Sequence, residues 1–458
     1  MAEEINVQGM LTRDQLTTLA ANGEIDTVLV AFPDMYGRLI GKRYDADYFL
    51  ASADHGMHFC NYLLACDMEM DTVPGYDYAS WAQGYGDDLA AIDWTTLRHA
   101  TWLDRSALVL CDVHSGASGE TVAVAPRAVL QRQIEHAAAL GYTLAGASEL
   151  EFFVFNETYS SAHEKKFDDL KTFGTYIEDY HLFQGTKVEG LIGAIRRHLK
   201  TSGIPVEFSK GEWGPGQHEI NLRYSDLITA SDRTVIFKQL AKEVAHDQEL
   251  TVTFMAKWDE AYAGNSQHIH LSLWGADGQQ NLFSVEDEFS DLFRWFMGGL
   301  LRHARAMTLF FAPIVNSYKR FQAESFAPTG IAWSRDNRTS GFRIVGQGSS
   351  LRVECRIPGA DSNPYLVFAA LLASGLDGIE NQIEPPPIFT GDVYTAGQFP
   401  HVPGSLREAI EEFEKSDLAR QAFGDDVMAH YLHFARTEQR KFDEIVTGWE
   451  RARYFERI

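Results

Sequence analysis

The chain has 458 residues, of which 45% are hydrophobic and 12% aromatic, so it is long enough for two domains with substantial cores. Its 64 acidic residues outnumber 40 basic ones and give a formal net charge of -24, and no block of Lys and Arg offers the basic surface of a nucleic-acid binder. No uncharged apolar run reaches the length of about 18 residues that a membrane span needs, so neither nucleic acid nor membrane is expected as a partner.

The N-terminal stretch MAEEINVQGM lacks the basic start and the apolar segment of a signal peptide, which predicts a cytoplasmic protein. Residues 12–21 are predicted to form a short helix, with Thr12 as its N-cap and Gln15 completing a capping box. Apolar strands are expected at 25–32 and near 107–113.

The next boundary signal is Pro126, which is expected to open a helix that Gly141 closes. The boundary between domains is therefore placed between 112 and 126, which gives domains of residues 1–115 and 116–458.

In the larger domain, helical periodicity alternates with short strands of period two, which is typical of a mixed α+β fold. The predicted helices cover residues 126–140, 187–202, 231–247, 290–310 and 363–380. None of the cysteines in the chain has metal-type spacing; they are Cys60, Cys66, Cys111 and Cys355.

The strand in TLAGASELEFFVF places two glutamates, Glu149 and Glu151, on one face. The opposite face is apolar and consists of Leu144, Leu150, Phe152 and Val154. Burying a carboxylate is costly unless a cation or hydrogen bonds compensate it, so this pair requires an explanation.

Three more segments repeat the arrangement of one apolar and one polar face. QHIHLSLW contributes His268, His270 and Ser272; LRVECRIP contributes Arg352, Glu354 and Arg356; EWGPGQHEINL contributes Glu219, with Glu212 brought back by a Gly-Pro-Gly turn. The pattern predicts a sheet whose inner face packs on helices and whose other face lines a cavity.

Such a face suits two divalent cations. Same-side positions on a strand lie about 6 to 7 Å apart, so Glu149 and Glu151 can each serve a neighbouring ion. Carboxylates with a histidine favour Mg²⁺ or Mn²⁺, and nearby arginines favour a phosphorylated substrate, which predicts an enzyme that uses a nucleotide. Taken alone, a Glu-x-Glu on a strand is more often a solvated face and a His-x-His is more often structural, and the arginines of SRDNRTSGFRIVG fit an exposed loop equally well. The agreement of four segments is what favours a site.

At these residues the sequence resembles the glutamine synthetase family. The successive blocks of that family are matched in order by PDMYGRLIGKR, CDVHSGASGETVAVAPR, ASELEFF, GEWGPGQHEINL, HIHLS, NSYKRF, NRTSGFRI and VECRIPGADSNPYLVFAALLASGLDGI. The match begins near residue 12 and is densest from 126 to 380.

The resemblance implies a small β-grasp-like N-terminal domain and a larger catalytic domain with a mainly antiparallel, curved sheet backed by helices. It also implies a homo-oligomer, commonly a dodecamer of two stacked hexameric rings, with active sites between subunits. The implied substrates are ATP, glutamate and an amine, with two or more Mg²⁺ or Mn²⁺ ions per site.

The resemblance also implies roles for individual residues. The first metal would be held by Glu151, Glu212 and Glu219, and the second by Glu149, His268 and Glu354. Glutamate would be bound by Gly264, Arg320 and Arg356, and the nucleotide by Glu207, His270, Ser272, Arg338, Arg343 and Arg352. The residues with catalytic roles would be Arg320, Arg338 and Arg356.

The sequence departs from the family where ammonium would bind. Cys60 follows Phe59 where ordinary glutamine synthetases have an aspartate, and Phe326 stands where their flap has a glutamate. Without these carboxylates, ammonium would be desolvated with no counter-charge. The expected amine pocket consists of His58, Phe59, Cys60, Glu324 and Phe326.

We therefore predict a ligase that joins glutamate to an organic amine, with alkylamines, ethanolamine or an aromatic amine favoured. One alternative is a true glutamine synthetase that uses ammonia, and another is a γ-glutamylpolyamine synthetase, which would need more acidic contacts than Glu324 supplies. A third alternative, from another class, is a catalytically silent structural or regulatory protein, and it would be expected to lack metal ligands.

Overall fold

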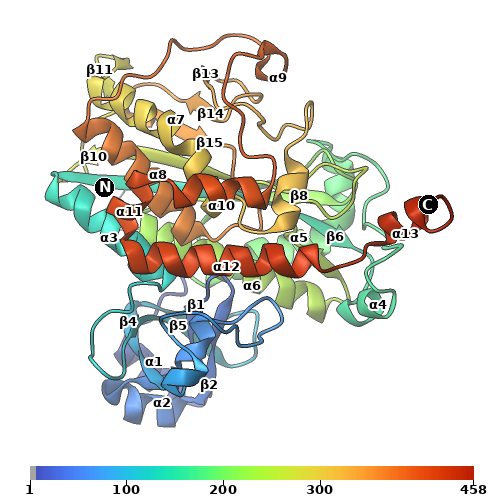
Figure 1. Cartoon of the computed structure of the whole chain (residues 1–458). Coiled ribbons are helices and arrows are strands. Elements are labelled where there is room, and N and C mark those ends of the chain that lie inside the picture. Colours follow the sequence, from blue (N-terminus) through green and yellow to red (C-terminus); the bar gives the residue numbers. More distant parts are fainter. Residues whose placement is uncertain (1–6) are drawn as a thin grey trace.

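The computed structural model describes residues 7–458, and its chain forms two sheets surrounded by helices (Figure 1). The N-terminal sheet has five strands in the order β2-β1-β5-β4-β3, with β1 and β5 parallel and the other neighbours antiparallel. Its strands are β1 Thr27–Pro33, β2 Leu39–Asp45, β3 Met57–Cys60, β4 Asp87–His99 and β5 Ser106–His114.

Two helices accompany this sheet, α1 (Arg13–Ala21) and α2 (Ala46–Ser52). The predicted capping box is confirmed, because the Thr12 hydroxyl accepts from the Gln15 amide while the Gln15 side chain accepts from the Thr12 amide. The prediction of strands at 25–32 and 107–113 is confirmed by β1 and β5.

The second sheet has eight strands and is mainly antiparallel. Its order is β13-β14-β15-β10-β6-β8-β7, and β9 pairs with the far end of β6. The strands are β6 Tyr142–Phe155, β7 Val206–Gly211, β8 Gln217–Leu222, β9 Thr251–Thr253, β10 Gln267–Gly275, β13 Trp333–Arg335, β14 Phe342–Val345 and β15 Arg352–Cys355, and a separate hairpin is formed by β11 Ser284–Val285 and β12 Glu288–Phe289.

The remaining helices are α3 Pro126–Ala139, α4 Tyr159–Glu164, α5 Leu182–Thr201, α6 Leu227–Asp247, α7 Asp291–Phe311, α8 Pro364–Glu380, α9 Val393–Ala396, α10 Leu406–Glu414, α11 Asp417–Phe423, α12 Asp425–Asp443 and α13 Gly448–Tyr454. Of these, α3, α5 and α6 contact strands of the second sheet. Short 3-10 turns occur at Ala53–His55, Asn61–Leu64, Trp81–Gln83, Val315–Arg320 and Gly348–Ser350. The mixed fold with a curved sheet backed by helices agrees with the predicted α+β class.

Two of the five helices predicted beyond residue 115 begin earlier than the sequence indicated. The helix expected at 187–202 begins at Leu182, whose side chain is exposed together with that of Phe183, so the first turn carries no amphipathic signal. The helix expected at 231–247 begins after Asp226, which caps it by accepting from the Thr229 amide at 2.9 Å. The starts of the other three differ by no more than one residue.

Helix α8 lies at the centre of the core. Nearly all its residues are buried, and it packs against α7, α3 and α6. A helix that is apolar all round is stable only when other elements surround it, so α8 holds the helical layer behind the sheet.

The N-terminal sheet is joined to the helical layer by a buried ionic cluster around Arg127 of α3. Its guanidinium donates to Asp232 of α6 (3.0 Å), to Asp93 of β4 (2.8 Å) and to Asp112 of β5 (2.5 Å).

The division into domains of 1–115 and 116–458 stays a prediction, and residues 1–6 lie outside the described part of the chain. No helix within residues 7–458 has the length and apolar character to cross a membrane.

Candidate active site

The polar face of the second sheet opens into a cavity of about 460 Å³. All six side chains predicted as metal ligands line it: Glu149 and Glu151 of β6, Glu212, Glu219 of β8, His268 of β10 and Glu354 of β15. The apolar set predicted for β6 is buried on the opposite face, toward the helices. The alternation of side chains along each strand therefore sorts the carboxylates into one site.

Three of these carboxylates form one cluster. Glu151, Glu212 and Glu219 can place one oxygen each so that all three lie within 4.8 Å of one another. Glu151 and Glu219 are directly opposite in the antiparallel pair of β6 and β8, where like charges repel.

Burial and this repulsion change the protonation of the cluster. Burial, followed by the charge of Glu212, raises the pKa of Glu151 to about 8. Burial and the neighbouring carboxylates likewise raise the pKa of Glu219 well above its usual value. A divalent cation would remove both costs at once, because its charge stabilises the ionised form of each carboxylate.

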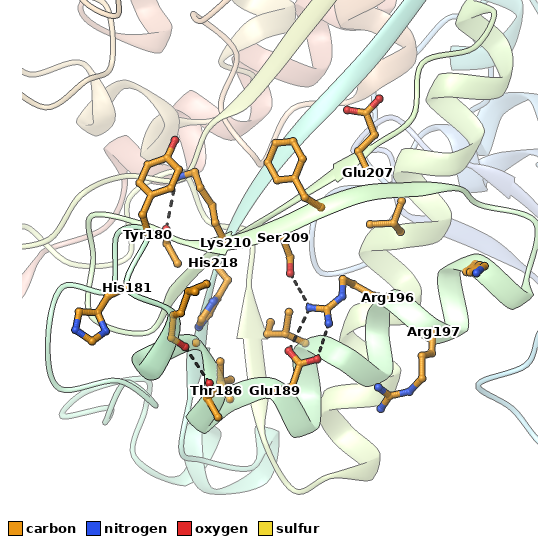
Figure 2. Close-up of a pocket in the computed structure, with 18 of the residues that line it drawn as sticks. Tyr180, His181, Thr186, Glu189, Arg196, Arg197, Glu207, Ser209, Lys210 and His218 are labelled. Carbon is orange, nitrogen blue, oxygen red and sulfur yellow. Dashed lines mark hydrogen bonds and ion pairs between the residues drawn. The ribbon is translucent and has the colours of Figure 1, made fainter. Parts of the chain in front are cut away.

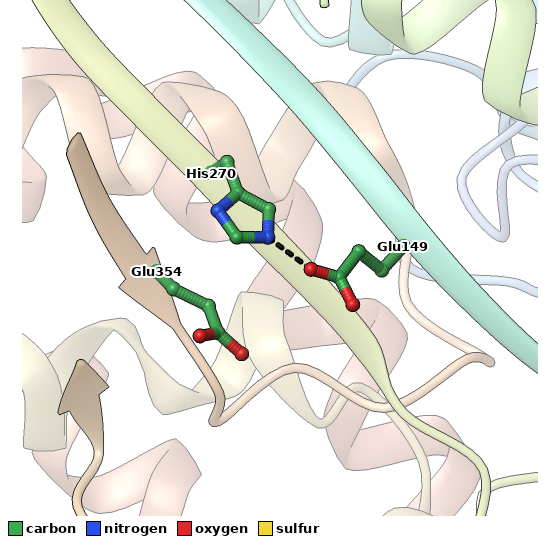
Figure 3. Close-up of side chains that lie close together, drawn as sticks. All are labelled: Glu149, His270 and Glu354. Atoms are coloured by element: carbon green, nitrogen blue, oxygen red, sulfur yellow. Dashed lines mark hydrogen bonds and ion pairs between the residues drawn. The ribbon is translucent and has the colours of Figure 1, made fainter. Parts of the chain in front are cut away.

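The second predicted set meets around His268. Its Nδ1 lies 3.8 Å from an oxygen of Glu149 and 3.7 Å from an oxygen of Glu354. Glu149 also contacts Nε2 of His270, and Figure 3 shows the carboxylate of Glu354 facing this pair from the neighbouring strand. His270, which the family resemblance places in the nucleotide region, therefore lies at the edge of the metal set as well.

These carboxylates are held in their ionised form. Burial opposes ionisation of Glu149, but hydrogen bonds with His268 and His270 hold its pKa well below the usual value. Burial also opposes ionisation of Glu354, but Arg356 and then His268 lower its pKa to about 2. The donors are carboxylates with imidazole at one end, which fits hard divalent cations that prefer oxygen ligands.

Arginines surround the same cavity. Arg338, Arg343 and Arg356 line it, and Arg343 donates to Glu354 at 2.7 Å and to Asp336 at 3.1 Å. Arg356 contacts the other oxygen of Glu354. The guanidiniums thus lie where negative charge from a phosphate or carboxylate would gather.

Arg320 lies behind the cavity wall. Its side chain is fully buried and donates to Ser266 Oγ at 3.1 Å and to the carbonyl of Ile357. Gly264, which does line the cavity, packs against the Arg320 stem so closely that an added Cβ would lie 2.5 Å from it. Within this chain the geometry gives Arg320 a role in holding the wall, and its role as a catalytic and glutamate-binding residue stays a prediction.

A second cavity of about 470 Å³ adjoins the first. Four of the predicted nucleotide residues line it, namely Glu207, His270, Ser272 and Arg352. Arg352 Nε lies 3.2 Å from His270 Nδ1, so the ring connects Arg352 to Glu149. Glu149, Phe208 and Asn221 line both cavities, which places Glu149 of the second predicted metal set at the border between them.

The largest of these spaces, about 1010 Å³, lies on the other side of β7, between that strand and α5 (Figure 2). Arg196 crosses it to donate to Ser209 at 2.7 Å and to pair with Glu189. Its lining contains none of the predicted metal ligands.

Of the five residues predicted for the amine pocket, only Phe326 lines the cavity. Phe59 is buried against Phe32 in the N-terminal sheet, with ring centroids 4.3 Å apart, and Cys60 donates to the carbonyl of Tyr85. His58 is exposed on β3. Glu324 lies on the same loop as Phe326 without lining the cavity.

The sequence analysis missed several lining residues. Lys210 of β7 pairs with Glu212 and lies over the ring of Tyr180, 4.5 Å from its centroid. Trp213 lines the cavity beside Phe326, and Gln217 donates to the carbonyl of Gly264 at 3.0 Å. One feature of the sequence could have identified two of them: Trp213 and Gln217 flank the Gly-Pro-Gly turn that returns Glu212 to the site.

Comparison with known proteins agrees with this geometry. Residues 123–454 match the family model described as glutamine synthetase, catalytic domain. The chain is 47% identical to a gamma-glutamylethanolamide synthetase from Streptomyces coelicolor over 446 residues, covering 97% of this chain and 96% of that protein. It is 34% identical to a glutamate–isopropylamine ligase from a Pseudomonas species over 464 residues, covering 100% of each, and 31% identical to the glutamine synthetase of Thermotoga maritima over 459 residues, covering 97% and 99%.

A solved structure, apo GmaS without ligand, is also similar. It superposes with a TM-score of 0.84 at 29% identity and covers 96% of this chain and 99% of that one. The two sheets, the carboxylate clusters and these matches over most of the chain lead to one conclusion: the chain belongs to the glutamine synthetase family.

Proposed function

We propose that the protein is an ATP-dependent ligase that joins the γ-carboxyl group of glutamate to an organic amine, with γ-glutamyl phosphate as intermediate. The observation that carries this proposal is the single polar face on which both carboxylate clusters, the arginines and the two adjoining cavities lie. The relatives named for γ-glutamyl amides of ethanolamine and isopropylamine support it.

In the first step an oxygen of the glutamate γ-carboxylate forms a bond to the γ-phosphorus of ATP while the bond to ADP breaks. Two anions must approach each other, so catalysis depends on positioning and charge stabilisation. Mg²⁺ or Mn²⁺, held by Glu151, Glu212 and Glu219 on one side and by Glu149, His268 and Glu354 on the other, would supply the positive charge that offsets this repulsion.

The arginines complete the charge balance. Arg338 and Arg343 line the cavity next to the clusters, where they can stabilise the transferring phosphoryl group, and Arg356 lies where it can bind a carboxylate of glutamate. Glu207, Ser272 and Arg352 hold the nucleotide in the adjoining cavity. These roles are carried over from the family to the matching positions of this chain.

In the second step the unprotonated nitrogen of the amine attacks the carbonyl carbon of γ-glutamyl phosphate. Inorganic phosphate leaves, and the nitrogen loses one proton as the amide forms. The cavity presents Phe326 rather than a carboxylate at this end, which favours an amine with an uncharged substituent over the ammonium ion.

Both the assembly and the location are part of the proposal. We infer from the family resemblance a homo-oligomer, a dodecamer of two stacked hexameric rings. The predicted amine-pocket residues of β3 do not line the cavity of their own chain, which supports a site completed by a neighbouring subunit. A cytoplasmic location agrees with the use of ATP and glutamate.

The test is ADP release by the purified protein with glutamate, ATP and Mg²⁺ or Mn²⁺ across a panel of methylamine, ethylamine, ethanolamine, isopropylamine, benzylamine, putrescine and ammonium. We expect turnover that requires glutamate and is fastest with one of the uncharged-substituent amines. Fastest turnover with ammonium would instead identify a glutamine synthetase.

A further inference from the structure

Two half-exposed aromatic rings meet at the rim of the cavity that the predicted metal ligands line. Trp213 and Phe326 both line it, and their ring centroids lie 5.7 Å apart in an edge-to-face arrangement with an interplanar angle of 68°. Trp213 is 50% exposed and Phe326 45% exposed. Large rings left partly in water at the edge of a cavity gain free energy when a ligand group covers them.

The backbone holds Trp213 rigidly next to the first carboxylate cluster. Trp213 directly follows Glu212 in the turn between β7 and β8, and the Glu212 amide donates to the carbonyl of Gln217 at 2.9 Å. The Gly214 amide donates to the Gln217 side chain at 2.9 Å, and a Cβ on Gly214 would lie 2.4 Å from the ring of Phe153. These contacts fix the backbone of the turn, and the Trp213 ring lies in the same cavity wall as the first carboxylate cluster.

Phe326 is held from the other side. Its backbone has φ of +59°, a left-handed conformation that is uncommon for a bulky side chain and persists only where the surroundings impose it. Its carbonyl accepts from Arg356 Nη2 at 3.3 Å, and the next carbonyl, of Ala327, accepts from the hydroxyl of Tyr394 at 2.9 Å. Arg356 also contacts Glu354, so the Phe326 loop is tied to the second cluster.

The aromatic pair lies outside the cavity that the predicted nucleotide residues line. Neither Trp213 nor Phe326 lines the adjoining cavity that contains Glu207 and Arg352. Glu149 of the second cluster lines both cavities, so a γ-carboxylate activated at the clusters lies next to the nucleotide cavity and inside the cavity that carries the two rings.

On the basis of the proposed function, we propose that Trp213, together with Phe326, forms the wall that binds the substituent of the amine, and that this wall selects small primary monoamines whose substituent is uncharged. The rings give an apolar, weakly cation-attracting surface without a fixed negative charge. Two carboxylates of this cavity, Asp179 and Glu212, face the ammonium group of Lys210, so a second ammonium group on the substrate would lose its hydration here and meet a positive charge that already pairs with them.

The experiment measures kcat and KM for ethanolamine, ethylamine, putrescine and ammonium with wild type, Trp213→Ala, Trp213→Phe and Phe326→Ala. A lost apolar contact costs roughly ten- to two-hundred-fold in selectivity, so we expect the alanine variants to lower kcat/KM for ethylamine relative to ammonium by at least about ten-fold. The loss should be in KM for the amine, with KM for ATP unchanged, and Trp213→Phe should recover most of it.

The matched control is Phe167→Ala. Phe167 is also exposed and left-handed, with φ of +59°, but lines none of the three cavities described above, so its replacement should leave amine selectivity unchanged. If wild type turns over amines but both alanine variants keep the wild-type ratio of kcat/KM for ethylamine to that for ammonium, the proposal of an aromatic wall is wrong. The proposed ligase function would be unaffected by that result. If wild type releases no ADP with any amine, the proposed function fails and the wall with it.

Discussion

Glu151 shows why buried carboxylates in this chain point to bound cations. Its oxygen accepts from the Ser266 amide at 2.7 Å, yet burial and Glu212 still raise its pKa to about 8. One hydrogen bond does not offset the loss of water around a charged group that also faces another carboxylate. The ionised form of Glu151 is favourable only when a cation lies beside it. The free-energy cost of burying its charge therefore applies to the metal-free site.

Metal binding should therefore release protons near neutral pH. With a pKa of about 8, Glu151 is largely protonated at pH 7, and the raised pKa of Glu219 acts in the same direction. A cation binds the ionised form, so an ion held by this cluster displaces protons and binds more weakly as the pH falls. Titration calorimetry with Mn²⁺ in two buffers of different ionisation enthalpy should give different apparent enthalpies at pH 7 and nearly equal ones at pH 9. Equal enthalpies at both pH values would contradict the raised pKa.

The same shift has a stability consequence in the metal-free protein. A raised pKa means that Glu151 contributes stability below its ordinary pKa of 4.5, and that this contribution is lost as the pH rises through about 8. Glu151→Gln should remove this dependence, so unfolding midpoints of variant and wild type should diverge between pH 5 and pH 8, with the variant the more stable at the upper end.

Removing a ligand from the second cluster should abolish catalysis without disturbing assembly. Glu149→Ala or Glu354→Ala leaves the fold's apolar core intact but removes a carboxylate from the metal set, and we expect ADP release to fall by at least about a hundred-fold. Glu288→Ala, at an exposed position on β12, is the control. Near-normal turnover by either cluster variant would show that the metal assignment is wrong.

Replacing Phe326 with glutamate would add a negative charge to the predicted amine site. Phe326→Glu places a carboxylate at the cavity end that now carries a ring, so ammonium and cationic amines should gain relative to ethylamine. The measurement is the ratio of kcat/KM values before and after substitution. An unchanged amine profile would argue against direct contact between residue 326 and the amine.

At the scale of elements, the Arg127 cluster fixes how the N-terminal sheet meets the helical layer. Arg127 is 4% exposed and Asp232 2% exposed, and Tyr365 also donates to Asp232 at 2.5 Å. Burying such a pair brings little net stability, but removing one partner leaves an uncompensated charge.

Arg127→Met should therefore lower the free energy of unfolding by about 3 to 5 kcal/mol. The exposed pair of Arg13 and Asp54 provides the comparison, since Arg13→Met should cost less than about 1 kcal/mol. Denaturant midpoints measure both, and adding Asp232→Asn to Arg127→Met should restore part of the loss. Equal losses in the free energy of unfolding for the two Met variants would contradict this role of the buried Arg127–Asp232 pair.

The sequence predicts the elements that have a strong internal pattern. The period of two on β6, β8, β10 and β15 identifies the polar face correctly, and with it five of the six predicted ligands, because strand side chains must alternate. The sixth, Glu212, was placed by the Gly-Pro-Gly turn that follows it. The starts of α5 and α6 were missed, since exposed apolar residues and a cap hide the amphipathic signal there. Trp213 and Lys210 were missed because their roles depend on a turn and a neighbouring loop rather than on a period.

At the scale of the whole molecule, the second half of the amine pocket must come from elsewhere if His58 and Cys60 belong to it. Neither lines the cavity of its own chain, while Phe326 does. In the proposed ring, the N-terminal sheet of one subunit would lie next to the second sheet of its neighbour, and such a heterologous interface can complete a site.

This arrangement can be tested by complementation between two inactive subunits. Glu149→Ala removes the catalytic half of the site, and Cys60→Arg should block the half contributed by β3. Co-expressed with different affinity tags and purified through both, the mixed oligomer should recover about a quarter of wild-type turnover, because each variant supplies the half that the other lacks. Each variant purified alone should stay inactive. If His58 and Cys60 instead acted within their own chain, every site in the mixed oligomer would carry one lesion, and no activity would return.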